Sequence, residues 1–167
     1  MAQSKKRKAL ILGIGNILLK DEGVGVRAME LFKETYEPTE AVSCVDGGTS
    51  GIGLLSLIKD FTHIIIFDAV SSDSPPGTIH RFSGKDLEKG PPLKTTAHQL
   101  GVKDLLLLSA FEGHRPEVSI IGIVPGNISA GLALTPLIKG KLPEAIEAAA
   151  EELTRFGFKV KKRKKDA

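Results

Sequence analysis

The sequence predicts an α/β fold: a three-layer α/β/α sandwich around a mostly parallel twisted sheet, in a single domain. Three observations support this prediction. Short apolar runs, which suit strands buried on both faces of a sheet, alternate with segments of helical periodicity. Turns rich in glycine and aspartate separate these segments. A length of 167 residues with 41% hydrophobic residues is enough to build one core without disulfides or a structural metal.

The first half of the chain alternates strands and helices in the order β-α-β-α-β. Each expected strand is apolar and is followed by glycine or aspartate, and Val24, Ala28 and Leu31 recur at helical spacing between the first two. This alternation predicts an open parallel sheet with helices on both faces. The expected strands are residues 8–12, 41–45 and 63–67, and the expected helices are residues 24–36 and 52–58.

The second half continues the pattern after a turn-rich loop. Residues 78–82 are expected to form a strand that returns along a sheet edge, and residues 118–124 a buried strand before Pro125. Helical periodicity marks residues 98–111. The last helix is expected to begin with Pro143 in its first turn and to end at Gly157, because proline suits the start of a helix and glycine its end.

Charge is concentrated at the two ends of the chain. The net charge is +3, but residues 1–8 and 159–167 hold ten of the 23 basic residues, so 13 basic and 19 acidic residues remain between them. We expect one domain over residues 1–167, with a folded body at 8–157 and mobile basic termini at 1–7 and 159–167. Because no aromatic residue interleaves the basic ones, we expect no nucleic-acid partner.

No apolar stretch reaches the roughly 18 residues that a membrane-spanning helix needs, so we expect no membrane insertion and a cytoplasmic monomer. Cys44 is the only cysteine, which excludes an internal disulfide. It lies in an apolar strand without a histidine motif, so it is interpreted as packing and not as a nucleophile. His63, His80 and His114 are assigned to surface or loop positions.

The glycine-rich motifs leave a nucleotide-binding enzyme as one alternative. The motif at Gly13 and Gly15 is similar to a dinucleotide fingerprint, but Leu18 stands where the third glycine would be needed. No Gly-Lys-Ser or Gly-Lys-Thr occurs in the chain, so a phosphate loop of the Walker type is absent from the sequence. A dinucleotide or ATP that raised the melting temperature would favour this alternative.

Acidic residues follow three of the predicted strands. Asp21 and Glu22 come shortly after the first strand, Asp46 directly follows the second, and Asp68 directly follows the third. Function in open α/β sheets gathers in loops at the carboxyl ends of the strands. We therefore expect these carboxylates to converge on one rim of the sheet.

A set of short motifs occurs along the chain in a fixed order: Gly13-Ile14-Gly15-Asn16-Ile17-Leu18, Asp21-Glu22-Gly23-Val24-Gly25, Asp46-Gly47-Gly48-Thr49, Asp68-Ala69, His98-Gln99-Leu100-Gly101, Pro125 and Gly131-Leu132-Ala133-Leu134-Thr135-Pro136. In order and spacing, these motifs resemble those of the hydrogenase maturation endopeptidases. The resemblance covers nearly the whole of residues 9–157, and the ordered set is far more specific than any one motif.

The resemblance implies an α/β/α fold and an endopeptidase that removes the C-terminal extension of a nickel-loaded NiFe-hydrogenase large-subunit precursor. It also implies that Glu22, Asp68 and His98 are the catalytic and metal-binding residues. They match, in this order, the family's Glu or Asp after the first strand, its Asp after the third strand and its later His. Asp21 is the weaker candidate of the acidic pair. The partner would be the precursor, and the nickel would be supplied by it, so that the isolated site holds no metal.

The residue types fit this assignment. Imidazole suits nickel and zinc, and carboxylates add charge. Three protein ligands leave positions open for substrate thiolates, a peptide carbonyl or water. Whether the ion activates water or only signals a loaded substrate is left open. A further alternative is a module in which the same rim senses the metal centre or binds a small ligand without cleaving. In a purely structural interpretation, Asp68 accepts a turn hydrogen bond and His98 faces solvent.

Overall fold

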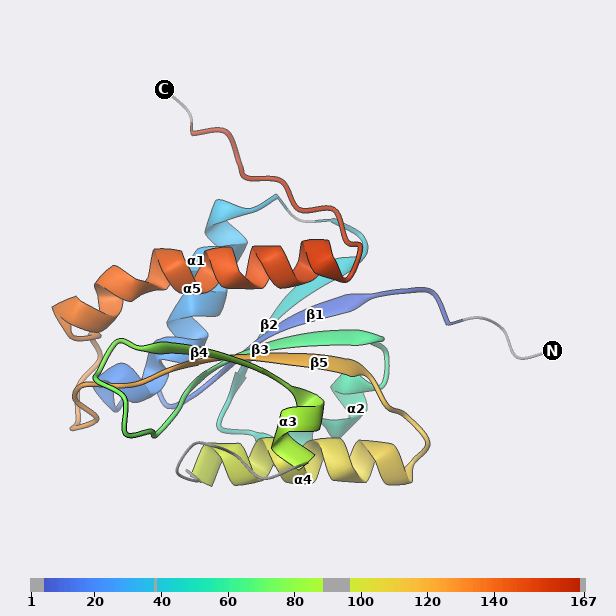
Figure 1. Cartoon of the computed structure of the whole chain (residues 1–167), viewed down its shortest axis with the longest axis horizontal. Helices are drawn as coiled ribbons and strands as arrows, with labels where there is room; N and C mark the ends of the chain where they lie inside the picture. Colours follow the sequence, from blue (N-terminus) through green and yellow to red (C-terminus); the bar gives the residue numbers. More distant parts are fainter. Residues whose placement is uncertain (1–4, 38, 89–96, 166–167) are drawn as a thin grey trace.

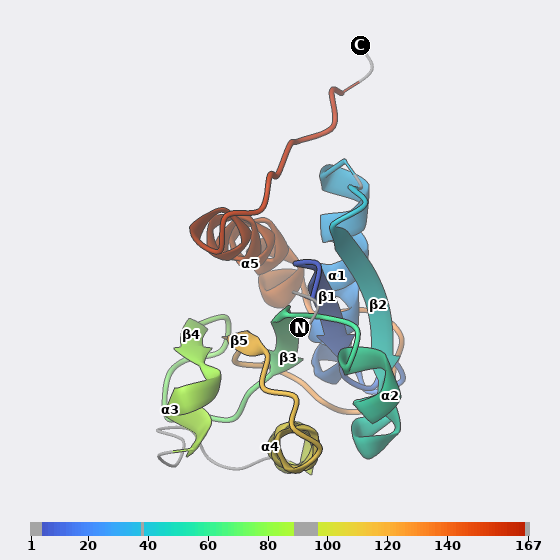
Figure 2. The same ribbon diagram turned by 90° about the vertical axis from the view of Figure 1, so that its right-hand side faces the viewer.

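The structure is a computed structural model that describes residues 5–37, 39–88 and 97–165, with the side chains of residues 88 and 97–100 outside the description. A five-stranded sheet in the order β2-β1-β3-β5-β4 lies between two layers of helices (Figures 1 and 2). The predicted α/β class, with helices on both faces of a mostly parallel sheet in a single domain, is confirmed. The strands are β1 (Ala9–Ile14), β2 (Val42–Gly48), β3 (His63–Ala69), β4 (Ile79–Ser83) and β5 (Glu117–Ile123).

Four strands are parallel and the last one reverses. β1 pairs in parallel with β2 and β3, and β3 pairs in parallel with β5. β4 runs antiparallel to β5, with Ile79 opposite Ile123 and Ser83 opposite Ser119. The strand that the sequence predicted along a sheet edge is therefore confirmed. The second strand is longer than predicted: β2 continues through Asp46 to Gly48, because these residues still pair with β1.

Each face of the sheet carries its own core. Helices α1 (Val24–Thr35) and α5 (Pro136–Arg155) cover one face, and α2 (Leu55–Ile58), α3 (Gly84–Glu88) and α4 (Ala97–Phe111) lie on the other (Figure 1). Ile11 and Phe67 are buried under the first pair of helices. Leu10 and Ile66, their neighbours along the strands, are buried on the opposite face. Burial on both sides explains why these strands are continuous apolar runs.

Helix α5 begins seven residues before the position expected from Pro143. Pro136 occupies its first turn, and Pro143 lies inside the helix. An internal proline costs about 3 kcal/mol because it lacks an N–H donor and crowds the preceding turn. Burial of Ile138 and Leu142, at about 1.5–3 kcal/mol for each side chain, offsets that cost. The predicted helix start is thus wrong, because packing outweighs the local signal.

The start of α1 lies directly on the ends of two strands. A Cβ at Gly25 would overlap the carbonyl oxygens of Ile14 and Phe67, and a Cβ at Gly13 would lie 2.7 Å from the carbonyl oxygen of Gly25. Only glycine allows backbones to approach this closely. The turn before α1 is thereby held against the carboxyl ends of β1 and β3.

Part of the basic tail is bound to the fold. The backbone N–H of Glu37 donates to the carbonyl oxygen of Lys161, and that of Arg163 donates to the carbonyl oxygen of Thr35, both at 2.8 Å. The chain beyond the end of α1 needs such partners for its backbone groups. Ordered contacts therefore extend past residue 157, the expected end of the folded body. Near the other terminus, the Arg7 guanidinium lies over the Phe158 ring.

None of the helices within the described ranges has the length and apolarity that crossing a membrane would require.

Candidate functional site

The candidate site lies at the carboxyl edge of the sheet, between β1 and β3. β1 leads through α1, on one face, to β2 on one side of it, whereas its neighbour β3 leads through β4, α3 and α4 to β5 on the other side, with α3 and α4 on the opposite face (Figure 1). The two neighbouring strands thus lead their connections to opposite sides. Open α/β sheets bind their ligands at such a switch point.

Asp68 lies at the end of β3 and is almost completely buried, with 2% of its surface exposed. Side chains alternate along a strand, so Asp68 lies on the same face as Ile64 and Ile66, which is the face covered by α4. Its Oδ1 atom has no hydrogen-bond partner among the described residues. Buried polar atoms are almost always paired, so an unpaired carboxylate oxygen indicates a position adapted to something other than stability.

Burial raises the pKa of Asp68 well above its ordinary value of 3.8. The backbone N–H of Ala69 opposes this effect, and the negative charge of Glu22 raises the pKa further. The turn of residues 20–23, which carries Glu22, contacts β3, which carries Asp68. The structure therefore places two of the three residues that the sequence predicted on neighbouring elements at this edge.

Glu22 belongs to the 3₁₀ turn η1 (Lys20–Gly23) that precedes α1. It is half-buried, and its carbonyl oxygen lies where a Cβ on Gly15 would have to be, so Gly15 permits the turn to fold onto the end of β1. Lys20 has a backbone φ of 47°, which lies in the left-handed region that residues other than glycine rarely adopt. The turn is thus compact and strained, and its geometry sets the direction of Glu22.

Asp21, the weaker of the two acidic candidates, has a different environment. It is fully buried and accepts four hydrogen bonds from the loop of residues 126–135. Burial raises its pKa, but the hydrogen bonds from Thr135, Asn127 and Gly126 outweigh burial, so the pKa lies below the ordinary value. Asp21 is therefore a satisfied carboxylate that binds a loop, and Glu22 is the member that acts on Asp68.

His98 lies in the first turn of α4, and its side chain belongs to the part of the chain that is not described. One turn further on, Gly101 and Val102 line a small cleft of about 60 Å³ together with Ile14, at the carboxyl end of β1. The start of α4 therefore lies at the same edge as Glu22 and Asp68. Within the described residues there is no cluster of three or more potential metal ligands, so the three-residue metal site remains a prediction.

Asp46, the remaining rim carboxylate, accepts a hydrogen bond of 2.8 Å from the backbone N–H of Gly48. It stabilises the local turn. His114 lies in a loop as predicted and bonds the carbonyl oxygen of Ile58. His63 and His80 do not fit the predicted surface or loop positions, because they stand half-buried on strands.

Local contacts explain the two strand histidines. The His63 ring packs on Phe156 and Phe158, with ring centroids 4.8 and 5.1 Å apart. His80 lies 3.2 Å from the Ser72 hydroxyl. Cys44 is half-buried in β2, and burial raises the pKa of its thiol. A thiol with a raised pKa is a poor nucleophile, which supports the packing interpretation.

The sequence analysis missed a set of exposed apolar side chains around the rim. They stand on segments that follow the carboxyl ends of parallel strands: Leu18, Ile52, Ile128, Leu132 and Leu137, each between 53% and 66% exposed. Single exposed leucines are ordinary, but all five of these follow strands that end at the edge of the buried carboxylates. The signal in the sequence that could have revealed them was the presence of apolar residues in or next to glycine-rich loops.

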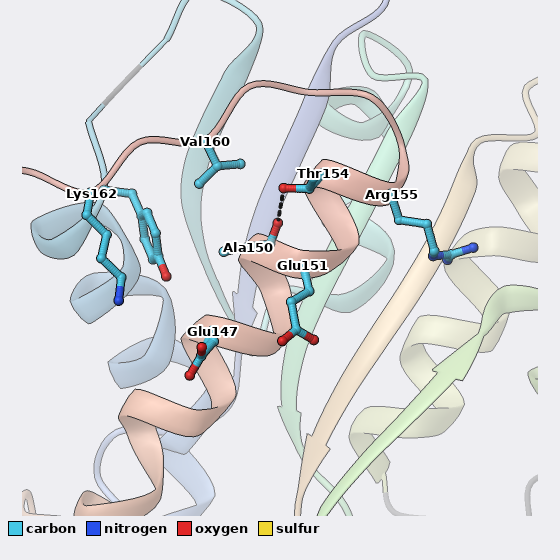
Figure 3. Close-up of a pocket in the computed structure, with 8 residues that line it drawn as sticks. Glu147, Ala150, Glu151, Thr154, Arg155, Val160 and Lys162 are labelled. Atoms are coloured by element: carbon cyan, nitrogen blue, oxygen red, sulfur yellow. Dashed lines mark hydrogen bonds between the residues drawn. The ribbon is translucent and has the colours of Figure 1, made fainter.

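A wider groove lies elsewhere, at the amino edge of the sheet. It has a volume of about 570 Å³ between the end of α1, the second half of α5 and the tail (Figure 3). Glu147 and Glu151 point into it from α5, and Lys162 reaches it from the tail (Figure 3). Glu151 is paired with Arg81 at 2.6 Å. The groove is therefore a charged surface feature that contains none of the predicted site residues.

Known proteins resemble this chain over most of its length. A family model described as hydrogenase maturation protease matches residues 26–152, a range that includes Asp68 and His98 and begins four residues after Glu22. The hydrogenase 2 maturation protease of Escherichia coli (strain K12) is 34% identical over 152 residues, which cover 90% of this chain and 93% of the relative. The hydrogenase expression/formation protein HupD of Rhizobium leguminosarum bv. viciae is 37% identical over 163 residues, covering 96% of this chain and 81% of the relative.

Solved structures show the same fold. The hydrogenase maturating endopeptidase HybD from E. coli matches with a TM-score of 0.86 and 32% identity, over 93% of this chain and 98% of that one. The [NiFe] hydrogenase maturation protease HybD from Thermococcus kodakarensis matches with a TM-score of 0.74 and 33% identity, over 87% of this chain and 98% of that one. Both matches cover nearly the whole of the compared proteins.

Proposed function

Because the chain belongs to the hydrogenase maturation protease family, we propose that it removes the C-terminal extension of a nickel-loaded NiFe-hydrogenase large-subunit precursor. One observation carries the proposal to particular residues. Asp68 is a buried carboxyl group at the carboxyl edge, with one oxygen that has no partner among the described residues and with the charge of Glu22 acting on it. Such an arrangement costs stability and is typical of functional sites.

We further propose that Glu22, Asp68 and His98 receive the nickel ion of the precursor. The donor types fit, because carboxylates and imidazole both bind divalent nickel. A cation beside Asp68 would partner its unpaired oxygen and favour the ionised form that burial and Glu22 oppose. The nickel enters with the precursor, so it acts as a mark of a loaded substrate at the place where the chain is cut.

Cleavage of a peptide bond needs a proton for the leaving amine as well as a nucleophilic water. The raised pKa of Asp68 lets this carboxyl group hold a proton until a cation binds beside it, and binding of the cation releases that proton at the site. Glu22 lies in a rigid turn, which fixes it relative to Asp68. The nickel, when present with the precursor, would polarise a carbonyl or a water that it contacts.

The test is cleavage of purified precursor, followed by the mass of its C-terminus. We expect nickel-loaded precursor to be shortened and nickel-free precursor to stay intact. Glu22→Gln, Asp68→Asn and His98→Gln should each slow cleavage by at least about 100-fold, because a misplaced reacting group alone costs this much. His80→Gln is the matched histidine control, since His80 lies on β4 and contacts the Ser72 hydroxyl of the preceding loop, and it should cleave at the parent rate.

Circular dichroism on each variant separates loss of chemistry from loss of fold. Cleavage by His98→Gln at the parent rate would remove this residue from the site. Membership of a protease family favours cleavage over the non-cleaving binding module considered from the sequence. Action as a monomer in the cytoplasm stays a prediction.

A further inference from the structure

Asp21 joins the turn before α1 to the loop of residues 126–135, because both of its carboxylate oxygens accept hydrogen bonds from that loop. Its Oδ1 atom accepts a hydrogen bond of 2.7 Å from the backbone N–H of Thr135. Its Oδ2 atom accepts bonds from the backbone N–H groups of Gly126 and Asn127, at 3.0 and 2.9 Å, and from the Thr135 hydroxyl at 2.8 Å. Hydrogen bonds to an ionised, fully buried acceptor are among the strong ones in proteins.

Backbone hydrogen bonds reinforce the same junction. The N–H of Asp21 donates to the carbonyl oxygen of Asn127 at 3.0 Å, and the N–H of Lys20 donates to that of Gly131 at 2.9 Å. Gly131 in turn donates to the carbonyl oxygen of Leu18 at 2.8 Å. The turn before α1 and the loop before α5 therefore form one bonded unit at the edge of the site.

Glu22 is the next residue along this unit. The unit contains the strained φ of Lys20, and its other end is pressed against Gly15 through the carbonyl oxygen of Glu22. Strain of this kind persists only where the surroundings hold it. The bonds of Asp21 supply that support immediately beside Glu22.

We propose that Asp21 is a positioning residue for cleavage, whose carboxylate holds Glu22 in its direction toward Asp68 and holds residues 126–135 as a wall of the site. The loop carries Ile128 and Leu132, two of the exposed apolar residues on the rim. Asp21 thereby fixes the orientation of Glu22 and the position of the loop of residues 126–135, which the precursor contacts. The catalytic consequence rests on the proposed function, whereas the holding of the loop does not.

Asp21→Asn is the sharpest variant. An amide keeps the shape of the carboxylate but replaces one of its oxygens with an NH2 group. In one orientation of the amide the NH2 group faces the backbone N–H of Thr135, and in the other it faces the N–H groups of Gly126 and Asn127 and the Thr135 hydroxyl. At least one backbone donor is therefore left opposed by another donor, whichever way the amide turns. Thr135→Val is the milder variant, since it removes only the hydroxyl bond.

Two readouts are measured at a temperature where circular dichroism shows the variants folded. Hydrogen exchange followed by mass spectrometry reports the protection of residues 126–135, and steady-state cleavage of nickel-loaded precursor reports kcat and KM. For Asp21→Asn we expect faster exchange in this loop, a kcat lower by roughly 10- to 100-fold and a higher KM. Thr135→Val should change kcat by only a few fold, and Asp60→Asn, an exposed aspartate, should change nothing.

A kcat within twofold of the parent in folded Asp21→Asn would overturn the proposal, because a purely structural bond would move stability alone. A fall in kcat with unchanged exchange in the loop would also overturn it, since Asp21 would then act directly on the reaction. If Asp21→Asn does not fold, the smaller changes in Thr135→Val decide. A parent protein that cleaves no precursor would refute the proposed function, while the exchange data would still show whether Asp21 holds the loop.

Discussion

Replacing Asp68 by asparagine should make the folded protein more stable while it removes activity. The side chain is 2% exposed, its Oδ1 atom has no partner in the described part of the chain, and the charge of Glu22 opposes its ionisation. A buried polar group without a partner costs about 1–3 kcal/mol when it is neutral and more when it is charged. Because the amide carries no charge to bury, we expect Asp68→Asn to raise the free energy of unfolding by about 1–3 kcal/mol at pH 7.

The gain should depend on pH in one direction. The pKa of Asp68 is raised in the folded state, so the folded protein binds more protons than the unfolded chain at pH values between about 3.8 and the folded pKa. The free energy of unfolding of the parent therefore falls as pH rises toward and through the folded pKa of Asp68. Below the pKa of Asp68 in the unfolded chain, this loss of stability vanishes. Asparagine does not titrate, so its advantage over the parent should be small at pH 4 and larger at pH 7.

Urea denaturation at both pH values measures these differences. Asp60→Asn is the matched control, because Asp60 is exposed and its replacement should stay within about 0.5 kcal/mol of the parent. An Asp68→Asn variant that is less stable than the parent at pH 7 would refute the reasoning. A gain of equal size at both pH values would also refute it, because burial of charge would then not be the cause.

Three further outcomes are expected. Gly25→Ala should lower the free energy of unfolding by about 1–3 kcal/mol in urea denaturation, because its Cβ would overlap two carbonyl oxygens, whereas Gly140→Ala, which meets open space in α5, should raise it by up to about 1 kcal/mol. Ending the chain after Arg163 should leave the melting temperature unchanged in a calorimetric scan. Ending it after Phe158 should lower that temperature by roughly 4–8 °C, because two backbone hydrogen bonds to the end of α1 are lost. Leu132→Asp, at a side chain 66% exposed, should raise KM for the precursor in steady-state assays and leave kcat and stability unchanged.

The sheet could be predicted from the sequence because burial on both faces leaves a direct signal. β1 and β3 are apolar at nearly every position, and their neighbours in the chain show helical spacing. The start of α5 could not be predicted in the same way. Pro136 and Pro143 carry the same local signal for a first turn, and the packing of Ile138 against the sheet shows that the helix begins at the earlier one.

The candidate site was predictable in position but not in chemistry. Asp68 follows an apolar strand, and this order alone places it at the carboxyl edge. Its unpaired oxygen depends on the surrounding elements and leaves no trace in the sequence. Asp21 and Glu22 are adjacent acidic residues that no local pattern separates, because the partners of Asp21 lie in a distant loop. The side chain of His98 lies outside the described residues, so its part in the site remains a prediction.

The hydrogen bonds of Asp21 also constrain the order in which the protein can become active. They join positions 105, 106 and 114 residues apart in the chain. Contacts at such separations form late, because the entropy of closing a long loop must be overcome first. During synthesis, Glu22 and Asp68 are present long before the loop that fixes their rim. An incomplete chain therefore holds both carboxylates without their supporting wall, and activity should appear only when almost the entire sequence has folded.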